Sequence, residues 1–236
     1  MLLFFLGPTK SLKNAFIIVK PEDSHLIQVI ENLKPFDEIQ NCTQEFLYPY
    51  MWQATGNNLD VINLPVQNEE YTEINEHFLN NAPPKAQVLS IQRIQNKTLY
   101  RDYVKKKCEY NLIQKKYEKK LWFSCDSTDV TELRTNGLNT KFMKVGRCGE
   151  GYQFYKESNT AFEIQLQSDQ RQDGNHYIYC CNVAVGNPIQ GNTSYKKGNI
   201  PAKCTSVVDN ITCPTMYTIF NENVFYPSYL LTFKIR

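Results

Sequence analysis

The run Leu121-Trp122-Phe123-Ser124-Cys125-Asp126 is the part of this sequence that says most about its fold class. From this run on, the pattern becomes strand-rich with short loops, through residues 148–154 (CGEGYQF) and 225–233 (FYPSYLLTF). From Leu121 to the end of the chain, such strands outnumber helices and do not alternate with them. This arrangement predicts the α+β class with largely antiparallel pairing.

Further strands and helices are predicted on both sides of this run. We expect strands over residues 14–19, 59–65, 88–94, 176–185 and 229–235, and helices over residues 21–33, 69–80, 97–120 and 129–135. The helix at 69–80 carries Tyr71, Ile74 and Phe78 on one apolar face. The helix at 129–135 ends at Asn136-Gly137, which is a good C-terminal cap.

The length and composition are those of a globular protein with one large domain. The chain has 236 residues, 42% hydrophobic and 21% charged, and its net charge of +2 gives no overall attraction to nucleic acid or membranes. Residues 1–45 are left unassigned, as a partial module or an extra layer on the main domain, and residues 46–236 are predicted to form that domain. The apolar start, residues 1–6, is too short to span a bilayer and lacks the features of a secretory signal. We therefore expect no membrane partner and an intracellular location, cytoplasmic or nuclear.

Eight cysteines and three histidines do not form a metal-binding pattern. No Cys-x-x-Cys pair occurs, so we predict free, buried thiols and no metal site. Cys125, within the opening run, would be a reactive thiol only if a base lay beside it, and an inert buried side chain is the preferred interpretation.

A lysine-rich stretch runs from Lys105 to Lys120. It predicts a basic surface, and a solvated helix face is the preferred interpretation because we expect no aromatic or arginine interleaving there. RNA binding is kept as an alternative on charge alone.

Six segments in a fixed order resemble the catalytic domain of the poly(ADP-ribose) polymerase (PARP) family. They are the Trp52 entry segment, residues 91–100 (IQRIQNKTLY), 123–138, 149–154, 176–186 and 209–233. From about Pro49 to Arg236, the chain is most similar to the macrodomain-linked, mono-ADP-ribosylating branch. The resemblance implies an ADP-ribosyltransferase fold, with two packed, largely antiparallel β-sheets flanked by helices.

The resemblance also implies a site for NAD+. In active members a histidine holds the adenosine ribose, the backbone of the following glycine grips the nicotinamide amide, and two tyrosines bracket the nicotinamide ring. A glutamate, or an apolar residue in mono-transferases, lies beside the nicotinamide ribose. The three catalytic positions fall here on Phe123, Gln153 and Met216. The cofactor-binding candidates are Ser124, Cys125, Tyr152 and Thr160.

Nearly all of these positions carry a side chain unlike that of active members. Phe123 offers no hydrogen bond to a ribose, and the Cβ of Ser124 crowds the place of a glycine. Gln153 and Thr160 provide no stacking ring. Tyr152 is next to the first tyrosine position, but on a strand it points to the opposite face. Met216 is compatible with mono-transfer.

Two functions follow from these substitutions. The preferred hypothesis is a catalytically degenerate domain that acts as a binding or scaffold module with a protein partner. The alternative is an active mono-ADP-ribosyltransferase with a rearranged site, in which Ser124 holds the nicotinamide, Gln153 or Tyr152 contacts the ribose, and Glu150 or Glu222 supplies the acidic group. NAD+ is the substrate only in the second case, with a protein acceptor.

Overall fold

The computed structural model describes residues 15–19, 27–31, 48–112, 114–166, 174–201 and 204–236. It divides the chain into two compact units, Met1–Thr55 and Gly56–Arg236. The domain boundary predicted at residues 45 and 46 lies outside the described residues.

The first unit contains a two-stranded antiparallel ladder. β1 (Ala15–Val19) pairs with β2 (Ile27–Glu31), with Phe16 opposite Ile30. The helix predicted over residues 21–33 is therefore wrong for residues 27–31, and the rest of it lies outside the described part of the chain. Three of these five residues are β-branched, which favours a strand, and pairing with β1 satisfies the backbone groups on one edge of β2.

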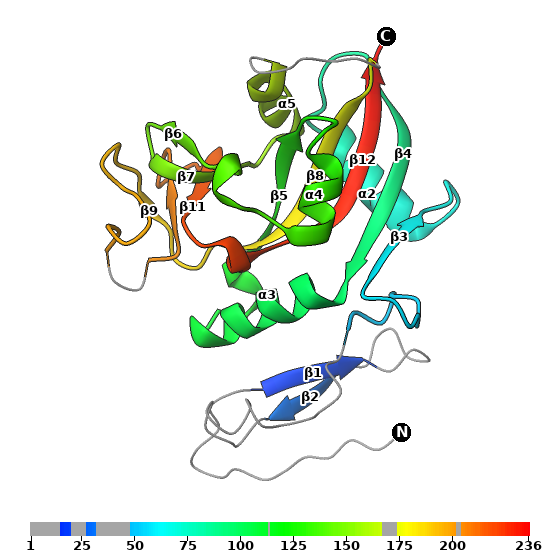
Figure 1. Cartoon of the computed structure of the whole chain (residues 1–236), viewed down its shortest axis with the longest axis horizontal. Helices are drawn as coiled ribbons and strands as arrows, with labels where there is room; N and C mark the ends of the chain where they lie inside the picture. The colour runs from blue at the N-terminus through cyan, green and yellow to red at the C-terminus, as the bar shows by residue number, and fades with distance from the viewer. Residues whose placement is uncertain (1–14, 20–26, 32–47, 113, 167–173, 202–203) are drawn as a thin grey trace. The chain divides into compact units, whose positions relative to one another are not determined.

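The second unit is built on one 10-stranded sheet (Figure 1). Its strands are β3 (Leu59–Asn63), β4 (Ala86–Asn96), β5 (Glu118–Cys125), β6 (Lys144–Gly146), β7 (Gly149–Tyr155), β8 (His176–Ala184), β9 (Ile189–Gln190), β10 (Ser206–Val208), β11 (Met216–Ile219) and β12 (Phe225–Ile235). The order is β3-β4-β12-β8-β5-β7-β11-β10-β9, with β6 paired to β7. Every pairing is antiparallel except the one between β9 and β10. The predicted α+β class with largely antiparallel pairing is confirmed.

The sheet is nearly divided at the junction of β5 and β7. These two strands share a single residue pair, Trp122 opposite Tyr155, whereas the ladder between β5 and β8 is continuous from Glu118 to Cys125. In Figure 1, β7, β9 and β11 lie on one side of β5, and β8, β12 and β4 lie on the other. The resemblance implied two packed sheets, whereas the structure joins the two groups of strands into one sheet through this single residue pair.

The helices of the second unit are α2 (Glu69–Leu79), α3 (Lys97–Glu109), α4 (Val130–Asn136) and α5 (Ser158–Leu166), and the single 3-10 turns are η1 (Lys115–Tyr117), η2 (Thr140–Phe142) and η3 (Glu222–Val224). α2 begins where the side chain of Asn68 accepts a hydrogen bond from the Glu70 amide at 2.8 Å, and it buries Ile74 and Phe78 as predicted. α4 ends at Gly137, as predicted, and its positive φ of 77° is a conformation that favours glycine.

The helix predicted over residues 97–120 is too long. α3 ends at Glu109, Asn111 turns left-handed with φ of 56°, and Glu118 already belongs to β5. The last lysines of the stretch are extended because they pair with β8, with Lys120 opposite Asn182. Sheet pairing has overridden the helical propensity of the lysines.

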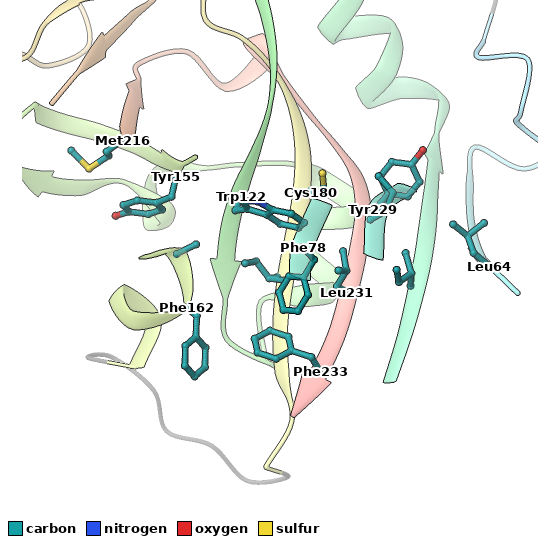
Figure 2. Close-up of a cluster of buried hydrophobic side chains, with 14 of the residues drawn as sticks. Leu64, Phe78, Trp122, Tyr155, Phe162, Cys180, Met216, Tyr229, Leu231 and Phe233 are labelled. Atoms are coloured by element: carbon teal, nitrogen blue, oxygen red, sulfur yellow. The ribbon is translucent and has the colours of Figure 1, made fainter. Parts of the chain in front are cut away.

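The helices cover both faces of the sheet. α2 and α5 lie on the face of Trp122, whose ring contacts Phe78 of α2 at a centroid distance of 5.7 Å. Figure 2 shows this core, with Trp122, Phe78, Leu231 and Phe233 gathered around the central strands. α4 lies on the opposite face, where the Tyr179 hydroxyl donates to the Val130 carbonyl oxygen at 2.8 Å.

Candidate functional site

The signature strand β5 sends consecutive side chains to opposite faces of the sheet. Trp122 and Ser124 point toward α2 and α5, while Phe123 points toward α4, because side chains alternate along a strand. The register supports this placement, since Phe123 is opposite Tyr179 on β8. The residue at the family's histidine position and the residue at its glycine position therefore have separate surroundings.

Phe123 lies in a cluster of aromatic rings. Its ring is 5.3 Å from that of Phe154 and 6.0 Å from that of Phe142, measured between centroids, and Phe154 is 5.5 Å from Phe225. Only 5% of its surface is exposed. Such tilted and edge-on contacts stabilise the core. The phenyl ring fills its site by packing and offers no donor or acceptor to a ribose.

Ser124 ties β5 to α5. Its hydroxyl donates to the Ala161 carbonyl oxygen at 2.5 Å. One residue further, the Gln165 side-chain amide donates to the Cys125 carbonyl oxygen, also at 2.5 Å. α5 thus lies directly on the end of β5, held by two side chain-to-backbone hydrogen bonds. Thr160, in the first turns of α5, is half-buried beside Ala161.

Gln153 and Met216 lie together on the β7–β11 part of the sheet. Tyr155 is opposite Met216, and Gln153 is opposite Thr218. Because Tyr155 is also opposite Trp122, alternation puts Gln153 and Met216 on the face of Trp122. The structure therefore does not bring Phe123 onto the same face as the other two catalytic positions. Figure 2 shows Met216 next to Tyr155 within the core.

Gln153 is already hydrogen-bonded within the protein. The Tyr155 hydroxyl donates to Gln153 Oε1 at 2.9 Å, and 9% of the residue is exposed. A Cβ added at Gly146 would lie 2.8 Å from Gln153 Nε2, so β6 packs closely over this side chain. Little room remains for a ligand to displace it.

Tyr152 forms a hydrogen bond with an acidic residue. It is fully buried, on the face opposite Gln153, and its hydroxyl donates to Glu222 Oε1 at 3.2 Å. Lys197 donates to both carboxylate oxygens of Glu222, at 2.8 and 3.0 Å. Partial burial acts to raise the pKa of Glu222, but the hydrogen bond from Lys197 and the other donors outweigh it and lower the pKa. Glu222 is therefore an ion-paired carboxylate.

Glu150, the second acidic candidate, is exposed. Its backbone amide donates to the Tyr195 carbonyl oxygen at 2.8 Å. It lies on β7 one residue from the buried Gly151, so its side chain faces solvent.

The cysteines of the described part of the chain are free, and four of them, Cys125, Cys148, Cys180 and Cys181, are buried. Burial raises the pKa of the Cys125 thiol well above its ordinary value, and the neighbouring Asp129 and Asp126 raise it further. A thiol in these surroundings stays protonated and inert. Among the residues that the structure describes, no three His, Cys, Asp or Glu side chains are placed to hold a metal ion.

Sequence reasoning missed the interactions that hold β5 to α5. The hydrogen bonds made by Ser124 and Gln165 join residues about forty positions apart, and no local pattern marks them. The only signal was the unusual serine at a glycine position.

Comparison with known proteins points to one family. No model of a protein family matches the chain. Human protein mono-ADP-ribosyltransferase PARP14 is 26% identical over 186 residues, which cover 75% of this chain and 10% of that protein. Mouse PARP12 is 24% identical over 181 residues, covering 73% and 25%. Mouse PARP11 is 22% identical over 221 residues, covering 81% and 66%.

This chain resembles the catalytic domain of the PARP mono-ADP-ribosyltransferases. It spans between a tenth and about two thirds of the length of these relatives. The sheet, the entry segment followed by β3 and α2, and the order of the signature strands agree with an ADP-ribosyltransferase-type domain. In the part of the chain that the structure covers, no helix is both long enough and apolar enough to cross a membrane.

Proposed function

We propose that this chain is an ADP-ribosyltransferase-type domain that has lost transferase chemistry and acts as an intracellular binding module for a protein partner. The proposal rests on the hydrogen bond between Ser124 and Ala161. In active relatives of this type, the backbone at position 124 is expected to grip the nicotinamide amide, and the side chain at position 160 to stack on the nicotinamide ring. Here the Ser124 hydroxyl is bonded to the backbone of Ala161, the residue that follows Thr160.

Three further candidate positions also have their side chains engaged within the protein. Phe123 packs on Phe142 and Phe154, Gln153 accepts from Tyr155, and Tyr152 donates to Glu222. A buried polar group of the cofactor that finds no partner in the protein weakens binding by about 1–3 kcal/mol. Three or four unpaired groups of this kind weaken a micromolar affinity for NAD+ to about millimolar or beyond.

The alternative, an active mono-ADP-ribosyltransferase with NAD+ as substrate, requires these interactions to break. The Ser124 hydroxyl would have to move away from Ala161 to admit nicotinamide to the Ser124 backbone, and Tyr152 would have to leave Glu222 and cross to the other face of β7. Both changes remove hydrogen bonds from largely buried groups, which disfavours this candidate.

Calorimetric titration of the purified chain with NAD+ tests the proposal. We expect no saturable heat up to millimolar NAD+. Saturable binding at micromolar NAD+ would overturn the proposal, and labelled NAD+ would then be used to test for automodification.

The variant Ser124→Gly tests the observation on which the proposal rests. Glycine removes both the Cβ and the hydroxyl, so we expect Ser124→Gly to bind NAD+ more tightly than the wild-type chain. Ser127→Gly is the matched control, because it makes the same chemical change at an exposed turn. Equal results for the two variants would show that the hydrogen bond to Ala161 is not what closes the site.

A further inference from the structure

Charge is unevenly distributed along this chain. Residues 97–120 contain nine lysine and arginine residues and three acidic ones, a net charge of +6. Because the whole chain carries +2, the remaining residues carry −4. The positive charge is therefore concentrated on one segment, where it creates a local potential that the small total charge conceals.

An ion pair and a hydrogen bond join the end of α3 to the start of β5 within this segment. Lys107 forms an ion pair with Glu118, and the Tyr103 hydroxyl donates to the same carboxylate at 2.5 Å. The Leu112 amide also donates to the Lys107 carbonyl oxygen at 2.7 Å. Lys107 and Glu118 therefore lie side by side, although they are separated in the sequence. We call Lys105, Lys106, Lys107, Lys115 and Lys116, with Tyr110 and Tyr117, the basic surface.

Several lysines of the basic surface have no acidic partner. Lys106 pairs with Glu109 and Lys107 with Glu118. Lys105, Lys115 and Lys116 are exposed and form no ion pair with any other described residue. Their charges are available to an external anion.

Aromatic rings lie among these lysines, contrary to the expectation from the sequence. The Lys106 ammonium is 5.3 Å from the ring centre of Tyr110, and the Lys116 ammonium is 4.8 Å from that of Tyr117. Tyr110 is 41% exposed. These contacts were not predicted because residues 97–120 were expected to form one helix, whereas they form α3, a turn, η1 and the start of β5.

We propose that the basic surface binds a single-stranded polynucleotide through its phosphates and stacks a base on Tyr110. Lysine charges that follow a phosphate backbone, combined with exposed rings for stacking, are how single strands are bound without sequence preference. An acidic protein segment would use the charges but gain little from the tyrosines. This proposal is independent of the NAD+ site, whose candidate residues lie at the other end of β5 and on β7, β11 and α5.

Fluorescence anisotropy tests the proposal with the whole chain, 1–236, and a labelled 20-nucleotide RNA of mixed sequence. A DNA strand of the same sequence distinguishes RNA from DNA, and binding of either supports the proposal. With three to five phosphate contacts, the slope of log affinity against log salt is expected to be about −2 to −3.5. Absence of binding at 0.1 M salt and 10 µM protein, a concentration chosen on the order of non-specific dissociation constants, would overturn it.

The variant K105Q/K115Q/K116Q should weaken binding at least about tenfold and reduce the magnitude of the salt slope by about 2. K156Q/K196Q/K234Q is the matched control, since these lysines are exposed, lie outside the basic surface and carry the same charge change. Equal weakening in both variants would mean general electrostatic attraction and would overturn the proposal.

Stacking is tested separately. Tyr110→Ala should weaken binding by roughly tenfold, whereas Tyr110→Phe, which keeps the ring and removes only the hydrogen bond of its hydroxyl with Asn221, should bind as the wild type does. A poly-glutamate peptide is the competing probe. If the peptide binds as tightly as RNA, and Tyr110→Ala weakens the binding of neither ligand, the partner is an acidic protein segment and the proposal is wrong.

Discussion

Phe123 and Ser124 are neighbours on β5, yet their side chains enter different parts of the molecule. Phe123 packs among rings on the face of α4, and Ser124 bonds to α5 on the other face. At the residue scale, the sequence identified both as substituted positions. It held no sign that the ring would fill an aromatic cluster and the hydroxyl would join two elements.

Restoring the family's histidine at position 123 should destabilise the protein. In Phe123→His, a polar ring replaces an apolar one that is 5% exposed, next to Phe142 and Phe154. We expect a loss of about 2–4 kcal/mol in the free energy of unfolding, measured by urea denaturation. Phe123→Leu, which keeps the site apolar, should lose about 1.5 kcal/mol or less. Equal stability of the two variants would mean that the imidazole finds a polar partner there.

At the scale of elements, α2 is fixed to two strands by a buried ionic network. Arg93 of β4 pairs with Glu70 of α2 at 2.6 Å, with side chains 7% and 13% exposed. The Tyr229 hydroxyl of β12 donates to the other oxygen of Glu70, also at 2.6 Å. Helix periodicity predicted the apolar face of α2, but not this polar network, because its partners are distant in sequence.

Removing the carboxylate from this network should leave the Arg93 charge buried and unpaired. We expect Glu70→Ala to lower the free energy of unfolding by about 3–5 kcal/mol, measured by chemical denaturation. Glu69→Ala is the control: Glu69 is exposed on the same helical turn, and its removal should cost less than about 1 kcal/mol. A similar small effect for both would show that water or another group compensates Arg93.

At the scale of the whole molecule, buried thiols and phenols make stability depend on pH. Burial raises the pKa of Cys180 from its ordinary value near 9 to about 12, and it raises the pKa of Cys181 well above that value. Burial likewise raises the pKa of Tyr100 from 10 to about 12. These groups ionise in the unfolded chain before they ionise in the folded one. The unfolded state therefore binds fewer protons above about pH 9, and stability is lost as pH rises.

We expect the free energy of unfolding to be nearly constant from pH 7 to 8 and to fall between pH 9 and 11, by up to about 1.4 kcal/mol per pH unit for each such group. Urea denaturation across this range measures the slope. Cys180→Ala should make the decline shallower by about one proton per molecule. Cys213→Ala, at an exposed position, should leave the slope unchanged. A flat profile to pH 11 would contradict this account.

The sequence by itself determined the fold class, most of the elements of the second unit and the resemblance, because strand and helix periodicity and the spacing of signature segments are local properties. It placed α2, α4, β3 and β8 nearly where they are, and it predicted β12 from Tyr229 although the strand begins at Phe225. It could not limit α3 to Glu109 or assign β2, because pairing of β5 with β8 decides the first and pairing of β2 with β1 decides the second. Only the tertiary structure decided which faces Phe123, Gln153 and Met216 occupy and that Ser124 reaches Ala161. Strand register and long-range hydrogen bonds set those arrangements, and a local sequence pattern predicts neither of them.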